Sequence, residues 1–104
     1  MNTERAKMLE NLIREDANDP FLHYGLAMEE AKASPQNALS LFDHLLAKFP
    51  DYLPAYYQFA LVLVDCGQIS KAIEVLQSGV QLAKSQGELK TMGELQTLLD
   101  QLND

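Results

Sequence analysis

Hydrophobic residues recur along this chain in two alternating patterns, each with the spacing of an amphipathic helix. The first pattern has apolar residues at positions i, i+1, i+3, i+4, i+7 and i+8. It begins at Ala38, again 34 positions later at Ala72, and 33 positions earlier at Arg5, where the first slot is polar. A repeat with this period predicts a helical solenoid, in which each unit buries its apolar face against its neighbours. It also favours a binding module over an enzyme.

The second pattern lies between the copies of the first and has apolar residues at i, i+3 and i+7. It begins at Phe21, at Tyr56 and, more loosely, at Leu89. A glycine inside a helix costs about 1 kcal/mol relative to alanine. We therefore expect a neighbouring helix backbone to approach closely at the small residue in the middle of each copy: Gly25, Ala60 and Gly93. The residues assigned to the core are Phe21, Tyr24, Gly25, Met28, Tyr56, Phe59, Ala60 and Leu63.

Capping residues and glycines mark the ends of the predicted helices. Asp19, Ser34 and Asp51 each stand where a helix should begin, close to a proline that suits a first helical turn. Gly67 and Gly87 stand where helices should end. The sequence therefore predicts six helices, at residues 3–16, 20–32, 35–48, 53–66, 69–84 and 87–102.

Composition narrows the class of protein. A chain of 104 residues with 47% hydrophobic residues predicts one folded domain and argues against disorder. The net charge of −7 opposes binding to nucleic-acid phosphates or to anionic membranes. No apolar run approaches the ~20 residues that a membrane span requires, and the first residues lack the apolar core of a signal peptide. The single Cys66 cannot form an intrachain disulfide, which favours a cytoplasmic location.

Two stretches carry a recognisable set of residues. Residues 53–84 have an aromatic, an aromatic–small pair, a turn glycine and a second-helix alanine at fixed positions: Tyr56, Phe59, Ala60, Leu63, Gly67, Ala72 and Leu76. Residues 18–50 match at Phe21, Tyr24, Gly25, Met28, Ala38, Phe42 and Pro50. This arrangement resembles the tetratricopeptide repeat family, although Leu45 replaces a small residue and Lys84 replaces the closing proline.

The resemblance implies an all-α fold. It would be a right-handed α-solenoid of antiparallel helix hairpins, with about two full repeats and a half-repeat at each end. The parts of this single domain, residues 1–104, would be an N-terminal half-repeat helix at 1–17, repeat 1 at 18–50, repeat 2 at 51–84 and a C-terminal capping helix at 85–104. With polar residues on both terminal helices, we expect a complete small protein or an autonomous domain.

The resemblance also implies a binding surface, because in this family the first helix of each repeat lines a concave groove that receives a partner segment. By position, the groove-facing residues would be Leu22, His23, Leu26, Glu29, Glu30, Tyr57, Gln58, Leu61, Val64 and Asp65. The repeat pattern does not need the apolar residues Leu22, Leu26, Tyr57 and Leu61, and an exposed apolar cluster usually marks an interaction site. Helix 87–102 could instead cover them. The acidic residues favour a partner with an apolar face and some basic character, or they form a solvated surface.

Residues that could carry chemistry are few. His23 and His44 lie on different predicted helices, and neither has a Cys or His at ligand spacing. Cys66 has no nearby Lys or Arg that would activate its thiol. No phosphate-binding loop or nucleophile motif is present in the sequence. We therefore expect no enzymatic activity, no cofactor and no metal.

Two functions remain open. The first is a non-enzymatic protein–protein interaction module, or adaptor, that binds a partner segment on the concave face. The alternative is a self-associating structural repeat protein, a homodimer formed through that face or through Leu95, Leu98 and Leu102.

Overall fold

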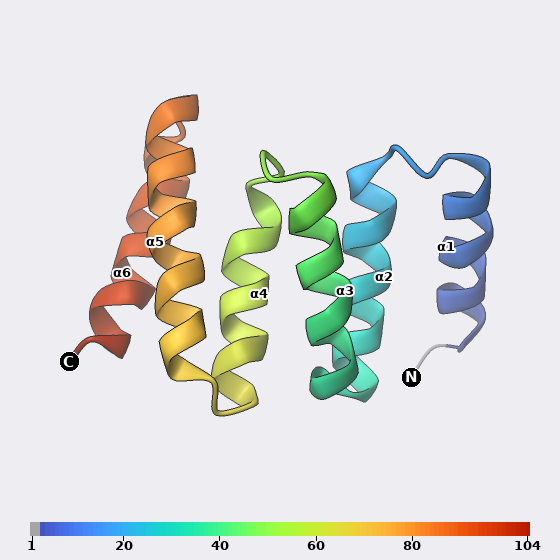
Figure 1. Ribbon diagram of the computed structural model, residues 1–104, viewed down its shortest axis with the longest axis horizontal. Helices are drawn as coiled ribbons and strands as arrows, with labels where there is room; N and C mark the ends of the chain where they lie inside the picture. Colours follow the sequence, from blue (N-terminus) through green and yellow to red (C-terminus); the bar gives the residue numbers. More distant parts are fainter. Residues whose placement is uncertain (1–2) are drawn as a thin grey trace. The chain divides into compact units, whose positions relative to one another are not determined.

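The computed structural model describes residues 3–104, and all regular structure in that range is α-helical (Figure 1). The helices are α1 (Thr3–Glu15), α2 (Pro20–Ala33), α3 (Pro35–Lys48), α4 (Pro54–Asp65), α5 (Ile69–Gln86) and α6 (Leu89–Leu102). The six predicted helices are confirmed, each with ends within two residues of those predicted. Residues 1 and 2, the start of the predicted half-repeat 1–17, lie outside the described residues.

Side-chain caps begin two of the helices as predicted. The Asp19 carboxylate accepts a hydrogen bond from the Phe21 N–H at 3.0 Å, and the Ser34 hydroxyl accepts one from the Asn37 N–H at 3.3 Å. Asp51 was expected to begin the fourth helix, and this is wrong, because the residue immediately before α4 is Leu53, whose side chain makes no capping hydrogen bond. Pro54 opens α4 and has no N–H, so this end has one fewer unpaired donor.

Glycines in the left-handed conformation end α4 and α5. Gly67 has φ of +76° and Gly87 has φ of +73°. After α4, the Gln68 N–H donates to the Leu63 carbonyl at 2.8 Å, and the Gly67 N–H donates to the Val64 carbonyl at 2.9 Å. This is the Schellman arrangement, and the same pair of bonds follows α5. Both predicted helix ends are confirmed.

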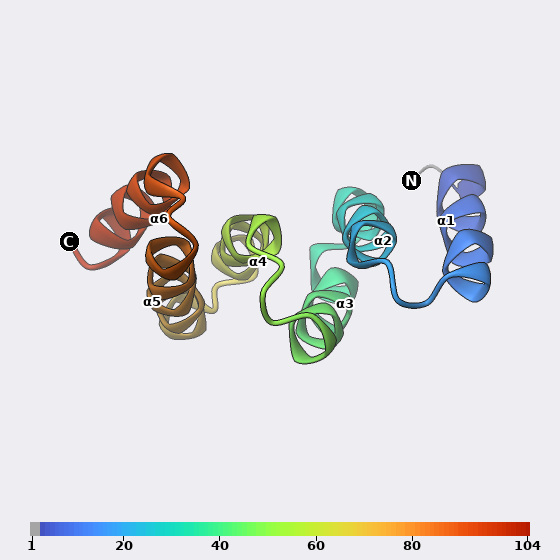
Figure 2. The ribbon, with the colours of Figure 1, turned by 90° about the horizontal axis from the view of Figure 1, so that it is seen from above.

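The chain divides into two compact units, which meet between Tyr52 and Leu53 in the sequence. In the first unit, α1 packs on α2 and α2 packs on α3, and both views show these pairs side by side (Figures 1 and 2). Leu9 of α1 is buried, while Phe42 and Leu45 of α3 are completely buried. The core of this unit therefore lies along both sides of α2.

In the second unit, α4 packs on α5 and α5 packs on α6. Leu63, Leu76 and Leu95, one from each helix, are completely buried. A Cβ added to Gly79 of α5 would lie 3.0 Å from Tyr56 Cβ and 3.2 Å from a Leu95 methyl. Gly79 thus allows α5 to lie close to both of its neighbours.

The small residues of the second pattern have three different surroundings. A Cβ on Gly25 would lie 3.3 Å from a Leu9 methyl, so α1 approaches α2 there through a side chain. Ala60 is completely buried. For Gly93 the expectation of close approach is wrong, because a Cβ there would meet nothing within 4 Å. The reason is that α6 buries Leu95, which points about 200° around the helix from Gly93.

The assignment of Phe21 to the core is also wrong, since its side chain is 64% exposed. Its counterpart Tyr56 in α4 is buried. The two helices present different sides to their neighbours: α2 buries Ala27 and Glu29, which lie on other faces of the helix from Phe21. Tyr24 and Met28, which share the expected face, are only half-buried.

Candidate functional site

Two of the predicted groove residues, Leu26 and Glu30 of α2, line a hollow of about 270 Å³ in the first unit. We call it the α2 hollow; its other lining residues are Glu10 of α1 and Asn37, Ser40 and Leu41 of α3. Leu26 and Leu41 form an apolar wall. Among the described residues, 3–104, neither the Glu10 nor the Glu30 carboxylate makes an ion pair. The hollow therefore combines apolar surface with uncompensated negative charge.

The tight turn at Ser34 determines which side chains meet in this hollow. Because α2 and α3 run antiparallel from that turn, residues at nearly equal distances from it come close together. Glu30 and Asn37 lie four residues before and three after Ser34, and Leu26 and Leu41 lie eight before and seven after it; all four line the hollow. The lining residues on α1 and α3 were not predicted. Counting outward from the predicted turn could have identified those on α3.

Glu29, predicted as part of an exposed acidic rim, is 3% exposed, so that expectation is wrong. One carboxylate oxygen, Oε1, pairs with Arg5 Nε at 2.8 Å and with Lys32 Nζ at 3.1 Å. The other, Oε2, is buried and has no hydrogen-bond partner among residues 3–104. Gly25 lies one turn earlier and lets α1 approach, which brings Arg5 to this carboxylate. Glu29 therefore holds α1 against α2 and is not available to a partner.

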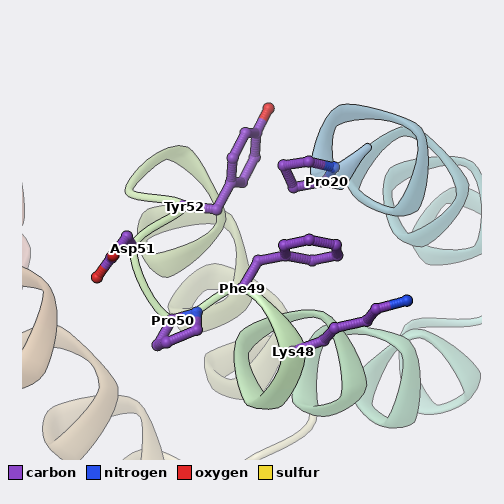
Figure 3. A pocket seen from close by; sticks show the side chains of 6 residues that line it. All are labelled: Pro20, Lys48, Phe49, Pro50, Asp51 and Tyr52. Carbon is purple, nitrogen blue, oxygen red and sulfur yellow. The ribbon is translucent and has the colours of Figure 1, made fainter. Parts of the chain in front are cut away.

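A second hollow, of about 300 Å³, lies where α2 begins and α3 ends. We call it the ring hollow; it is lined by Pro20, Lys48, Phe49, Pro50, Asp51 and Tyr52. The rings of Pro20, Phe49 and Tyr52 surround a common space, and Lys48 and Asp51 extend to opposite sides (Figure 3). None of these residues was predicted as a site. The sequence does show a cluster of ring-bearing residues after α3, namely Phe49, Pro50 and Tyr52. These residues come close to Pro20 only when α2 and α3 have folded into a hairpin.

His23, a predicted groove residue, lies close to Phe49 of the ring hollow and does not line the α2 hollow. Its ring centroid is 5.7 Å from that of Phe49 and 6.2 Å from that of His44. The Ala17 carbonyl accepts hydrogen bonds from His23 Nε2 at 2.9 Å and from Lys48 Nζ at 3.0 Å. The Lys48 ammonium also lies 5.5 Å from the centre of the Phe49 ring. His23 and Lys48 thus support Phe49 and hold the end of α3 close to the residues before α2.

Tyr24 supports the opposite wall of the ring hollow. Its ring centroid is 5.5 Å from that of Tyr52, with the planes tilted by 58°. Burial raises the pKa of the Tyr24 phenol, and the nearby Tyr52 raises it further. Burial also raises the pKa of Tyr52, with a smaller contribution from the negative charge of Asp19. Both hydroxyls are therefore protonated at neutral pH and can donate hydrogen bonds.

The remaining predicted groove residues are partly accessible. Leu22 of α2 is half-buried, and in the second unit the residues on α4 are half-buried or exposed: Tyr57, Gln58, Leu61, Val64 and Asp65. Within residues 3–104, no three His, Cys, Asp or Glu side chains gather in a way that could hold a metal ion. Across the same range, none of the helices combines the length and apolar character that crossing a membrane demands.

Antiparallel helix hairpins joined by short turns define an α-helical repeat protein. The model of the tetratricopeptide repeat family matches residues 31–92. A solution structure of a tetratricopeptide repeat domain protein from Salinibacter ruber is 32% identical, with a TM-score of 0.78, over 84% of this chain and 89% of that one. A crystal structure of such a domain from the same organism is 31% identical, with a TM-score of 0.76, over 82% of this chain and 97% of that one. The chain belongs to the tetratricopeptide repeat family.

A protein from Bordetella parapertussis, solved in solution, has the same fold. Its TM-score is 0.80 at 24% identity, over 94% of this chain and 86% of that one. No curated protein sequence matches the chain significantly. The comparisons therefore give the fold and the family, and the general role of that family is protein–protein interaction.

Proposed function

We propose that the protein is a non-enzymatic adaptor that binds a segment of a partner protein through the α2 hollow and the accessible groove residues of α2. The observation that supports this most directly is the composition of the α2 hollow. Leu26 and Leu41 offer apolar contact beside the carboxylates of Glu10 and Glu30. A partner segment with an apolar face and some basic side chains would complement both features. The net charge of −7 would attract such a segment from a distance.

Replacing Leu26 with aspartate tests this proposal. Leu26 is half-buried at the surface, so Leu26→Asp should change the melting temperature little while placing a charge on the apolar wall. Partners captured from native lysate by the wild-type protein and identified by mass spectrometry should be lost with this variant. The control is Leu89→Asp, which makes the same change at an exposed residue of α6, outside the hollow. If Leu26→Asp retains the same partners, or if the wild type captures none, the proposal is wrong.

Self-association is the second candidate, and one observation favours it. Met8 and Leu12 of α1 are 53% and 39% exposed, and their spacing of four residues places them on one side of the helix. Of the contact residues predicted on α6, Leu95 is completely buried, whereas Leu98 and Leu102 are half-buried. A dimer through α1 should dissociate in the Met8→Glu, Leu12→Glu double variant. Light scattering that shows only monomer up to about 100 µM, far above the Kd of a stable homodimer, would rule this out.

A further inference from the structure

The ring hollow is chemically different from the α2 hollow and is not used by the proposed groove. Its volume of about 300 Å³ is at the lower limit of small-molecule pockets, which span about 300–1,000 Å³. It is therefore suited to one or two side chains of a peptide. Four of its six lining residues carry rings, and Phe21, next to Pro20, is an exposed aromatic.

Flat rings around a shallow space suit proline better than a flexible aliphatic chain. A proline-rich segment already occupies the extended polyproline II conformation, so it loses little conformational entropy when it docks against aromatic rings. Its carbonyl groups make no internal hydrogen bonds and need donors. The Tyr52 hydroxyl can be such a donor, because a tyrosine phenol is protonated at neutral pH.

Charges near the hollow indicate what should flank the proline. Asp51 is exposed at one side (Figure 3), and Asp19 is close enough to Tyr52 for its charge to act on the phenol. Lys48, on the opposite side, donates to the Ala17 carbonyl and lies against the Phe49 ring. The carboxylates therefore favour a basic residue in the ligand, on the side of Tyr52 and Asp51.

We propose that the ring hollow is a second binding site, which takes a proline-containing extended segment of a partner protein. The proline ring lies among Pro20, Phe49 and Tyr52, and a basic side chain of the segment lies beside Asp51. This site does not depend on the α2 hollow, because the two share no lining residue.

A peptide titration of the full chain tests the site. The probe is a peptide of six prolines with an arginine at each end, followed by amide chemical shifts. The amides of residues 19, 21, 48, 49, 51 and 52 should shift and saturate, with a Kd of about 0.1–1 mM for so small a contact; Pro20 and Pro50 have no amide proton. The same peptide with every proline replaced by alanine should bind at least about tenfold more weakly, because the rings lose their ligand. Equal binding of the alanine peptide, or no saturable shift with the proline peptide, overturns the proposal.

Variants of the protein locate the binding. Tyr52→Ala removes one wall and should abolish saturable binding, whereas Tyr52→Phe keeps the ring and should weaken binding by about two- to tenfold through loss of the hydroxyl donor. Asp51→Lys changes only an exposed residue and should reverse the preference, so that a glutamate-flanked proline peptide binds better than the arginine-flanked one. An unchanged preference would contradict the proposal even if Tyr52→Ala failed to fold.

Leu26→Asp separates the two sites. This variant should bind the proline peptide as the wild type does, although it should lose partners of the α2 hollow. Loss of proline binding in Leu26→Asp would show that the peptide binds in the α2 hollow, and the ring hollow would then not be the site. Loss of lysate partners with intact proline binding would leave both proposals standing.

Discussion

At the residue scale, two glycines inside helices of the second unit should respond in opposite ways to replacement by alanine. Gly79 is buried between α4 and α6, while Gly93 lies on the solvent side of α6. Helix propensity alone predicts that replacing either glycine with alanine stabilises the helix by the same amount. The surroundings predict opposite changes in stability, because only Gly79 has neighbouring atoms where the methyl group would lie.

We expect Gly93→Ala to raise the free energy of unfolding by about 0.5–1 kcal/mol, because alanine restricts the unfolded chain and fits the exposed helix. Gly79→Ala should lower it by about 1–2 kcal/mol, since overpacking typically costs about 1–3 kcal/mol and only part is recovered as helix propensity. Urea denaturation of both variants measures the difference. Equal effects at the two positions would mean that α5 has room to move away from Tyr56.

The tyrosine pair predicts a dependence on alkaline pH. Burial raises the pKa of Tyr24 and Tyr52 above 10.0, their ordinary value, so the folded chain holds these protons more tightly than the unfolded chain. Their contribution to stability is complete below about pH 10 and is lost as the pH rises through the folded-state pKa. Thermal melts between pH 9 and 11 should therefore show decreasing stability.

Tyr52→Phe provides the control for this prediction. It removes the nearby phenol that contributes to the raised pKa of Tyr24, so Tyr24 should titrate closer to its ordinary value in a phenolate absorbance titration. A Tyr24 pKa that does not change in this variant would contradict the electrostatic coupling, although burial could still raise both values.

At this scale, only some of the residues of the candidate site could be predicted from the sequence. The resemblance to the repeat family placed Leu26 and Glu30 outside the core, and both are half-buried in the structure. Periodicity shows which residues share a side of a helix, but it does not show where a neighbouring helix lies around that helix. The predictions for Glu29 and Phe21 were therefore both wrong: Glu29 was expected to face the groove and is buried against α1, and Phe21 was expected in the core and is exposed.

At the scale of elements, α1 is held to α2 by a short set of contacts. Leu9 packs on Gly25, and Arg5 pairs with the buried Glu29 carboxylate one turn away. Arg5 is largely exposed but the Glu29 carboxylate is almost completely buried, so removing Arg5 would leave a buried charge with one partner fewer. The ion pair and the burial of Leu9 should therefore both contribute to the attachment of this helix.

We expect Leu9→Ala to weaken the docking of α1 by about 2–3 kcal/mol, as for other buried leucines that leave a cavity. Hydrogen exchange of α1 amides should accelerate while the amides of α3 keep their protection, because α3 packs on α2 through a larger contact of its own. Met8→Ala is the matched control on the exposed side and should leave exchange unchanged. Equal acceleration in α1 and α3 would instead indicate global unfolding.

Helix ends were the most predictable elements, because prolines and glycines act through local backbone geometry. Gly67 and Gly87 end helices wherever the rest of the chain lies. The ring hollow could not be predicted in the same way. It forms only when the start of α2 meets the end of α3, and that meeting depends on the length and path of the whole hairpin.

At the scale of the whole molecule, helix packing joins neighbours in sequence: α1 with α2, α2 with α3, α4 with α5 and α5 with α6. Such local contacts require only short loops to close during folding. The main refolding phase should therefore fall in the microsecond-to-millisecond range that is typical of helical proteins. Temperature-jump or stopped-flow fluorescence of the tyrosines measures it, and a main phase of seconds would contradict this expectation.

The order of these contacts has a consequence for synthesis in the cell. A helix that leaves the ribosome needs only the segment made just before it or just after it, and not a strand that is still untranslated. The nascent first unit can thus begin to pack α2 on α1 and α3 on α2 while the second is still being made. All six residues that line the ring hollow belong to this first unit, so the polypeptide that builds the hollow has been synthesised before translation of the second unit begins.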